Sequence, residues 1–135
     1  ARFHAQVLTD DVTYAFFSPR FPNAEQIHEL MDLKDAVMFA GPEYNGLWQY
    51  LHNYFQHRGV KANLSYDPGM SIFTERMIIE SGEGVGFGGK YSLLYRNQDL
   101  RRLPLEMTGA LGAVWCGDNS NPVIRPYIRG LLAQF

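Results

Sequence analysis

Short apolar runs alternate with longer amphipathic stretches along this sequence, and each of these runs ends at glycine or proline. AVMFA at 36–40 is followed by Gly-Pro, KANLSY at 61–66 by Asp-Pro-Gly, and VGF at 85–87 by two glycines. Between the first two runs, apolar side chains at 44–57 recur at the spacing of a helix face. The order strand, loop, helix thus repeats, and it predicts an α/β fold whose sheet is mainly parallel.

The same signals predict the remaining elements. We expect further strands over 12–18 and 110–116, and helices over 24–33, 71–81 and 121–135. Four apolar side chains of the helix over 71–81 are expected to be buried: Ile72, Phe73, Met77 and Ile79. Gly59 is the expected C-terminal cap of the helix over 44–57.

The composition limits the class of protein. A length of 135 residues is enough for one domain with a buried core. Hydrophobic residues make up 46% of the chain and charged residues 19%, which excludes a disordered chain. A formal net charge of -2 and a pI near 6.1 argue against a nucleic-acid-binding surface on this chain.

The sequence also bears on cellular location. It has no run of about 20 apolar residues, so no membrane span is predicted, and no signal peptide opens it. The single cysteine, Cys116, leaves no internal disulfide and has no metal-ligand companion at useful spacing. We expect a cytoplasmic protein without a cofactor. Because the sequence begins with Ala1, we also expect it to be a piece of a longer protein.

Residues 84–92 read GVGFGGKYS, which contains the spacings of two nucleotide-binding loops, G-x-x-x-x-G-K and G-x-G-x-x-G. In both loops a strand leads in and a helix leads out, because the phosphates bind at the helix N-terminus. Here the glycines follow a predicted helix, and Tyr91 stands where the first motif needs a small hydroxyl. The order of elements therefore argues against a nucleotide. We expect Gly82 to be a left-handed cap, Gly84 to lead into the strand, and Gly86 to press against a neighbouring backbone.

No catalytic or metal-binding constellation stands out. His52 and His57 are five residues apart on a predicted helix and so lie on different faces. His28 and Glu29 lack the second histidine of a zinc-protease helix, and Cys116 lies in an apolar strand. The remaining carboxylates are interpreted as solvated or helix-end charges: Glu43, Asp67, Glu75, Glu80 and Glu83. We therefore predict no catalytic residue and no metal site.

The repeated order of elements indicates where a ligand would bind. In open parallel sheets the binding crevice lies beyond the carboxyl ends of the strands, where loops and helix N-termini present backbone donors. The loops at 40–45, 67–71 and 88–91 follow the predicted strands. Two helix N-termini and Lys90 would suit a small anion or a polar metabolite. Ordinary turns that hold no ligand are the alternative.

Three segments are more specific than any single motif: SGEGVGFGGKYSLL at 81–94, LGAVWCGDNSNPVIRPYIRGLL at 111–132 and QVLTDDVTYAFFSPRFP at 6–22. Together, in their order and spacing, they resemble the C-terminal part of the effector-binding domain of LysR-type transcriptional regulators. The resemblance runs from about Phe3 to the end of the sequence. One departure is Gly89, where the family often has proline.

The resemblance implies a fold like that of type 2 periplasmic binding proteins, with two three-layer lobes and an effector held between them. Residues 19–105 would form the second lobe, 12–18 and 110–116 the strands that cross between lobes, and 121–135 a closing helix. The DNA-binding winged helix-turn-helix and most of the first lobe would lie outside this sequence.

The resemblance also implies which residues bind. The effector would contact the three loops through Gly41, Pro42, Glu43, Pro68, Gly69, Met70, Ser71, Gly89 and Lys90. Two chains would pair antiparallel through the helix over 44–57 and the strand over 61–66, with Trp48, Tyr50, Tyr54 and Leu64 as candidates. The spacing of the aromatic residues in this helix also fits a core face.

The expected function is therefore ligand sensing in a LysR-type regulator, and not catalysis. A small-molecule effector would bind between two lobes and shift the DNA-binding state of a homodimer or tetramer, with DNA bound only through the missing N-terminal domain. A free-standing α/β small-molecule-binding lobe or a small enzyme is the alternative. It would show an unpaired carboxylate, or Cys116, with a displaced pKa in a pocket.

Overall fold

The computed structural model describes residues 3–116, 122, 126, 127, 129, 130 and 133, and within β1 and β5 it describes side chains only between Val12 and Met107. The chain divides into two compact units, one of Ala1–Val12 with Thr108–Phe135 and one of Thr13–Met107. The site and its supports all lie in Thr13–Met107, called the larger unit below. Most of the helix predicted over 121–135, and the side chain of Cys116, lie outside the described part.

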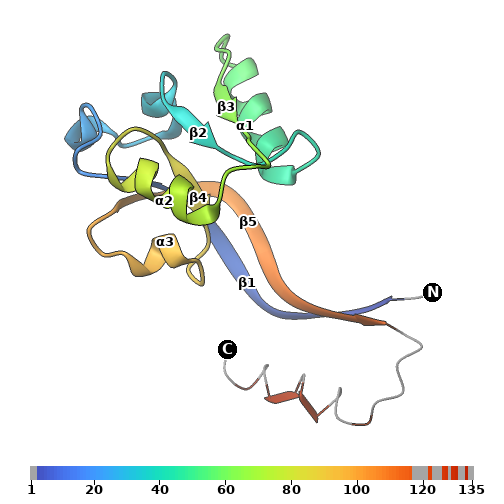
Figure 1. The fold of residues 1–135 in the computed structure, drawn as a ribbon. Coiled ribbons are helices and arrows are strands. Elements are labelled where there is room, and N and C mark those ends of the chain that lie inside the picture. The colour runs from blue at the N-terminus through green and yellow to red at the C-terminus, as the bar shows by residue number, and fades with distance from the viewer. Residues whose placement is uncertain (1–2, 117–121, 123–125, 128, 131–132, 134–135) are drawn as a thin grey trace. The chain divides into compact units, whose positions relative to one another are not determined.

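Helices and strands alternate through the larger unit (Figure 1). In chain order they are β1 (Phe3–Phe17), 3₁₀ helices Ala24–Gln26 and Leu30–Leu33, β2 (Val37–Phe39), α1 (Gly46–Gln56), β3 (Asn63–Ser65), α2 (Ile72–Glu80), β4 (Gly86–Gly88), α3 (Leu93–Arg96) and β5 (Arg101–Cys116). The predicted mixture of strands and helices is confirmed. The strand expected over 110–116 is longer than predicted, because β5 already begins at Arg101.

The described strands of the larger unit pair both in parallel and antiparallel. β2 and β3 are joined through α1 and pair in parallel, as expected for a strand, helix, strand unit. Met38 of β2 also forms a parallel bridge with Val85. β1 lies between β4 and β5 in the other sheet, and β1 and β4 are antiparallel with Tyr14 opposite Gly88 and Phe16 opposite Gly86. The expectation of a mainly parallel sheet therefore holds for β2 and β3 but is wrong for β1 and β4, because β1 precedes the helix-connected series and runs against it.

Successive residues of β1 point to opposite sides, as strand geometry requires. Ala15 and Phe17 belong to the larger apolar cluster, whereas Phe16 belongs to a second one with Ile79 and Leu94. The larger cluster also includes the fully buried Leu33, Met38, Leu51, Phe55 and Val85. β1 thus supports two apolar clusters, and burial of a phenylalanine side chain contributes about 1.5–3 kcal/mol.

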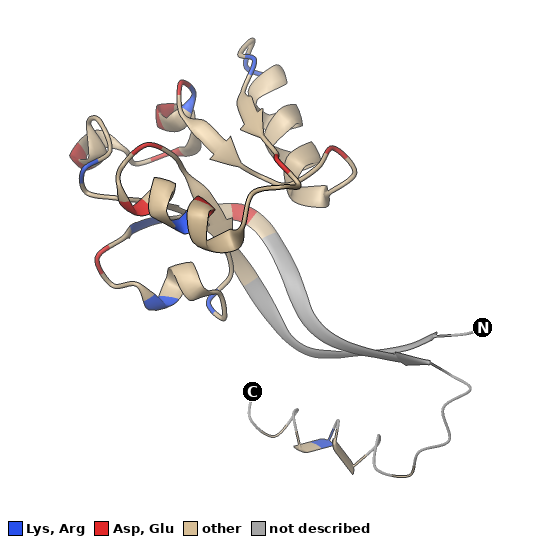
Figure 2. Ribbon diagram, viewed as in Figure 1, with Lys and Arg blue, Asp and Glu red and all other residues tan. Residues whose placement is uncertain are grey.

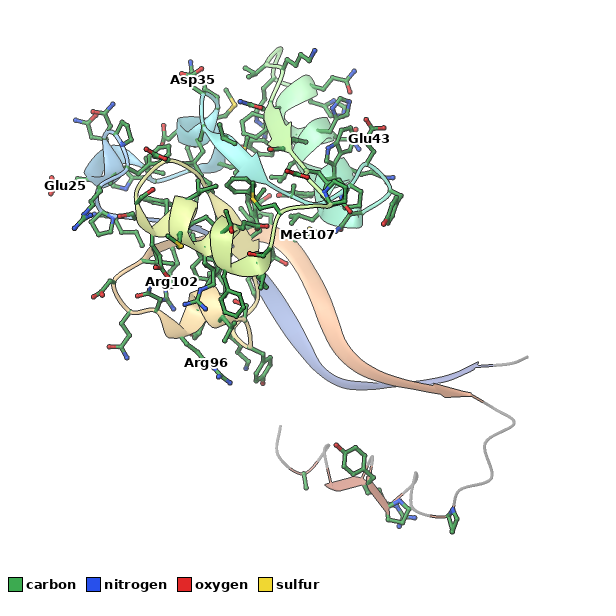
Figure 3. The ribbon with its side chains drawn as sticks, viewed as in Figure 1. Glu25, Asp35, Glu43, Arg96, Arg102 and Met107 are labelled. Carbon is green, nitrogen blue, oxygen red and sulfur yellow. The ribbon has the colours of Figure 1, made fainter. Side chains whose placement is uncertain are left out.

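Arg102 covers the edge of the second cluster (Figure 3). Its guanidinium carbon lies 4.4 Å from the centroid of the Tyr95 ring and 5.5 Å from that of Phe16. One guanidinium nitrogen donates to the Asn97 carbonyl at 3.3 Å. The aromatic faces and the hydrogen bond together hold the cation over an apolar surface.

The helix predicted over 24–33 is instead two short 3₁₀ helices, Ala24–Gln26 and Leu30–Leu33. Asp32 accepts the backbone N–H groups of His28 at 3.0 Å and Glu29 at 3.1 Å. These two hydrogen bonds, in that order, hold the pKa of the Asp32 carboxyl below its usual value. Because a side chain satisfies these backbone donors, the chain does not continue as one α-helix.

Helix α1 begins and ends where the sequence indicates. The Asn45 side chain accepts the Leu47 N–H at 3.0 Å, and Gly59 has the left-handed φ of 72° expected after a helix. Leu51 and Phe55 are buried on its inner face. The helix over 44–57 is therefore confirmed in type, two residues shorter at its start and one at its end.

Helix α2 buries less than predicted. Ser71 caps it by accepting the Thr74 N–H at 3.1 Å. Of the four apolar residues expected to be buried, only Ile79 is, whereas Ile72, Phe73 and Met77 are 61%, 67% and 70% exposed. The prediction of their burial is wrong, because α2 packs through one narrow side and these side chains point away from it.

The glycines near α2 have steric roles. Gly82 has a φ of 89°, and a Cβ on it would lie 2.9 Å from the backbone carbonyl carbon of Arg20. A Cβ on Gly84 would collide with the Phe39 ring, at 2.6 Å. At Gly86 it would collide with the Ile79 and Leu94 side chains, so the close neighbours of Gly86 are side chains and not the predicted backbone. Gly82 is confirmed as a left-handed cap, and the glycine motif is explained without a phosphate.

Charges of both signs are mixed over the described part of the larger unit. Figure 2 shows Lys, Arg, Asp and Glu interspersed along the ribbon of the larger unit. Over the described residues, no helix combines the length and the apolar character that a membrane crossing would require.

Candidate functional site

The carboxyl ends of β2 and β3 meet at one edge of their sheet, because the strands are parallel and Phe39 pairs with Ser65. A pocket of about 260 Å³ opens at this edge. We call it the strand-end pocket. It is lined by Phe39, Gly41, Ser65, Tyr66, Asp67, Pro68, Met70 and Glu75.

The structure brings together part of the predicted site. Of the nine candidates, Gly41, Pro68 and Met70 line the strand-end pocket. Four others belong to the same two loops but do not line it: Pro42, Glu43, Gly69 and Ser71. Glu43 is exposed on the loop between β2 and α1 (Figure 3).

The third predicted loop is separate from this pocket. Gly89 and Lys90 follow β4 and are not among the lining residues. The Lys90 ammonium lies 5.2 Å from the centroid of the Tyr91 ring. The lysine that suggested a small anion therefore does not reach the pocket.

The nine candidates omit five lining residues, of which only Asp67 lies in a predicted loop: Phe39, Ser65, Tyr66, Asp67 and Glu75. Phe39 and Ser65 are the last residues of their strands, so strand ends rather than loops alone mark the pocket. Glu75 lies one turn inside α2, four residues after Ser71, and so faces the same way as the loop before the helix. That spacing was the available signal for Glu75.

Local hydrogen bonds fix the loop between β3 and α2. Asp67 Oδ1 accepts the Gly69 N–H at 2.9 Å, and the Asp67 carbonyl accepts the Met70 N–H at 3.0 Å. The Ser71 hydroxyl accepts the Thr74 N–H and lies 3.1 Å from Thr74 Oγ1. Ser71 is thus a helix cap, and its hydroxyl is already engaged by α2.

The loop between β2 and α1 is fixed as well. Gly41 has a φ of 78°, a conformation that disfavours other residues. A Cβ on it would lie 2.9 Å from Nδ2 of Asn45, which caps α1. The pocket wall at Gly41 therefore depends on the absence of a side chain.

The pocket is acidic and partly aromatic. Asp67 and Glu75 supply carboxylates, Phe39 and Tyr66 supply aromatic rings, and no lysine or arginine lines it. Burial raises the pKa of the Glu75 carboxyl above its usual value of 4.5. Desolvation is the one cause of that rise, so no neighbouring cation offsets it.

The predicted pairing residues Trp48, Tyr50, Tyr54 and Leu64 are all half-buried against the larger apolar cluster. Trp48 stacks on His52 with ring centroids 4.8 Å apart. Arg58 lies 3.6 Å from the Tyr54 ring centroid and donates to the Tyr54 carbonyl at 2.9 Å. The aromatic residues of α1 therefore serve the core, and part of each remains at the surface.

A second pocket of about 270 Å³ lies where Tyr50, Tyr54 and Arg58 face β5. Burial raises the pKa of the Tyr50 hydroxyl, and the charge of Glu106 raises it further, while a hydrogen bond with the Glu106 backbone opposes the rise. Both glutamates of this pocket, Glu29 and Glu106, lie on its exposed rim. This pocket is lined by no strand end or helix N-terminus of the parallel sheet.

The described carboxylates outside the two pockets occupy local structural positions. Among the described residues, no three His, Cys, Asp or Glu side chains are placed to hold a metal ion. Glu80 lies 3.6 Å from Arg76 and accepts a hydrogen bond from Asn97 at 3.2 Å, as expected for a helix-end charge. The strand-end pocket combines the aromatic side chains of Phe39 and Tyr66 with the carboxylates of Asp67 and Glu75.

Solved structures share this fold. The CcmR regulatory domain from Synechocystis PCC6803, in complex with 2-PG, matches 98% of this chain with a TM-score of 0.71 and 14% sequence identity. HinK, a LysR family transcriptional regulator from Pseudomonas aeruginosa, matches 98% with a TM-score of 0.68 and 18% identity. The fold is that of a LysR-family regulatory domain. The reduced regulatory domain of OxyR2 from Vibrio vulnificus agrees, with a TM-score of 0.65 and 17% identity.

The LysR-family structures are longer than this chain. It spans 49% of HinK, 66% of the CcmR regulatory domain and 65% of the OxyR2 regulatory domain. HinK is a LysR family transcriptional regulator, and the other two structures are regulatory domains. No protein-family model matches the sequence, and no curated protein matches it either.

Proposed function

We propose that this chain is the ligand-sensing part of a LysR-type transcriptional regulator. The observation that carries the proposal is the LysR-family fold over 98% of the chain, together with a pocket at its strand ends. Parallel α/β sheets bind ligands at that edge. A small-molecule effector is the proposed occupant, and the chain acts by binding and not by catalysis.

The proposed mechanism is a shift between conformations. A ligand that contacts two lobes favours the lobe angle in which it makes more contacts. A homodimer or tetramer would transmit that angle to the spacing of its DNA-binding heads. DNA would be bound only through an N-terminal domain outside this sequence, in the cytoplasm.

The proposed architecture is that of a type 2 periplasmic binding protein, with a three-layer second lobe over 19–105. The compact unit Thr13–Met107 supports that boundary. Residues 12–18 and 110–116 would be the crossover strands, 121–135 a closing helix, and most of the first lobe would lie outside this sequence. The continuous strands β1 and β5 support the crossover assignment, since both run through the boundaries of the unit.

The proposed pairing surface comprises α1 and β3, with Trp48, Tyr50, Tyr54 and Leu64. Its support is that each of these side chains is only half-buried within the larger unit. A partner chain would complete their burial. The proposed effector contacts are the nine loop candidates, of which Gly41, Pro68 and Met70 have the strongest support because they line the pocket.

One observation favours the alternative of a small enzyme or a free-standing binding lobe. Glu75 is a carboxylate with a raised pKa in a pocket, as that alternative requires. The lining, however, offers no histidine, cysteine or lysine to act with it, and the hydroxyls are those of Ser65 and Tyr66. A raised pKa by burial alone fits a binding wall without further chemistry.

The coding sequence that precedes Ala1 tests the regulator proposal most directly. A winged helix-turn-helix, a linker helix and a first lobe encoded there would support it. A start codon immediately before Ala1 would contradict the DNA-regulator proposal and leave binding or catalysis by the lobe alone.

Ligand binding is tested with two tyrosine variants. Tyr66 lines the pocket and Tyr44, 84% exposed, lies in the loop before α1 without lining it. We expect a compound library to contain ligands that raise the melting temperature, and Tyr66→Ala to abolish that rise while Tyr44→Ala preserves it. Equal responses of the two variants would place the ligand elsewhere.

A further inference from the structure

The strand-end pocket carries a charge that the fold alone does not dictate. Asp67 and Glu75 bring carboxylates to a cavity of about 260 Å³ that no lysine or arginine lines. We propose that this pocket binds the positively charged group of a small organic amine against Asp67 and Glu75, with Phe39 and Tyr66 around its apolar part. The inference rests on the proposed sensing function and names its ligand class.

The Glu75 carboxylate of the pocket is partly buried. A carboxylate that is partly removed from water without a neighbouring cation is destabilised in its charged form. The raised pKa of Glu75, caused by burial, reflects this destabilisation. A bound ammonium would remove it. An anionic ligand would increase it, because like charges in a partly dry cavity repel.

The positive end of α2 is the feature that favours an anion, and groups of α2 itself offset it in part. The Ser71 hydroxyl accepts the Thr74 N–H, and the Ser71 carbonyl accepts the Glu75 N–H at 3.1 Å. Glu75 itself lies in the first turn, where its charge offsets the helix dipole. With two carboxylates and no lysine or arginine in its lining, the pocket carries side-chain charge that favours a cation.

The aromatic walls agree with this choice. Tyr66 is 52% exposed although it lines the cavity, so its ring is available to a ligand. Phe39 also lines the cavity, and its ring packs closely against Gly84, which has no side chain in the way. Aromatic faces attract cations through the ring quadrupole, and they also cover the carbon skeleton of an amine.

The test uses three probes that share a phenyl ring and a two-carbon chain: 2-phenylethylamine, 2-phenylethanol and 3-phenylpropionate. Dissociation constants are measured by NMR titration of the whole 135-residue chain. We expect the amine to bind at least about tenfold more tightly than the carboxylate, as one charge-assisted hydrogen bond implies. Glu75→Gln and Asp67→Asn should each weaken the amine several-fold, and Asp67→Asn keeps an oxygen for the Gly69 N–H.

Glu25→Gln is the matched control, because Glu25 is an exposed carboxylate of the 3₁₀ helix Ala24–Gln26 that does not line the pocket. It should leave amine binding unchanged. Preferred binding of 3-phenylpropionate that Tyr66→Ala abolishes would overturn the amine inference and leave the sensing proposal intact. Absence of binding by all three probes would also overturn the inference, while the sequence encoded before Ala1 decides the sensing proposal separately.

Discussion

At the scale of single residues, glycines show how sharply the fold constrains side chains. Gly82 combines a φ of 89° with backbone of Arg20 at 2.9 Å from a hypothetical Cβ. Gly46, the first residue of α1, has nothing within 4 Å of such an atom. The same chemical change should therefore have opposite effects at the two positions.

We expect Gly82→Ala to lower the free energy of unfolding by about 1–3 kcal/mol, because both strain and a backbone clash oppose the methyl group. Gly46→Ala should raise it by about 0.5–1 kcal/mol through helix propensity. Urea unfolding of both variants measures this. A neutral Gly82→Ala would show that the turn after α2 relaxes readily.

Glu75 predicts a pH dependence. Burial raises its pKa in the folded state, so the folded chain holds the proton more tightly than the unfolded chain. Its contribution to stability is therefore present at low pH and is lost as the pH rises from the unfolded value of 4.5 through the folded one. Glu75→Gln should remove this loss and stabilise the chain at pH 7 by less than about 1 kcal/mol, because the side chain is partly exposed.

Unfolding free energies at pH 4 and pH 7 measure the effect. The gain of Glu75→Gln should be larger at pH 7 than at pH 4. A variant that is less stable than the parent chain at pH 7 would mean that the favourable interaction of Glu75 with the α2 N-terminus outweighs its desolvation.

At the scale of elements, α2 exposes three large apolar side chains, more than any other helix described in the larger unit. Phe73 and Met77 are four residues apart and lie on the same face of α2, and Ile72 is the neighbour of Phe73. Large exposed apolar patches drive association. Two surfaces thus compete as contacts between chains, α2 with exposed side chains and α1 with half-buried ones.

We expect the chain to associate at high concentration, and the double variant Phe73→Ser, Met77→Ser to reduce that association without loss of stability, since both side chains are already exposed. Sedimentation velocity over a range of concentrations measures it. Tyr44→Ser is the control for a single exposed aromatic residue outside α2. Unaltered association of the double variant would direct attention to Trp48 and Tyr50 on α1.

Local signals predicted the type of most elements, except the helix over 24–33, which is two short 3₁₀ helices. Asn45, Gly59 and Ser71 act within a few residues of themselves, so their caps can be read from the sequence. The side of α2 that is buried and the antiparallel pairing of β1 with β4 depend on residues far along the chain. No periodicity of the sequence encodes those contacts, and there the predictions were wrong or incomplete.

At the scale of the whole molecule, charge limits the partners. A net charge of -2 with interspersed signs gives no surface to replace the counterions of DNA. We expect the 135-residue chain alone to show no binding to duplex DNA in mobility-shift experiments at 50 mM to 200 mM salt. Salt-sensitive binding would contradict the assignment of DNA recognition to another part of the protein.

The two-sided packing of β1 has a consequence for how such chains diverge. Phe16 fills one cluster and Phe17 the other, so a single inserted or deleted residue would exchange the two sides at once, whereas apolar replacements at each position keep them. We therefore expect apolar substitutions in β1 to be tolerated during evolution, and insertions or deletions in it to be rejected. Such substitution fits the comparison with the solved structures, in which the fold is similar at TM-scores of 0.65–0.71 although the sequence identity is 14–18%.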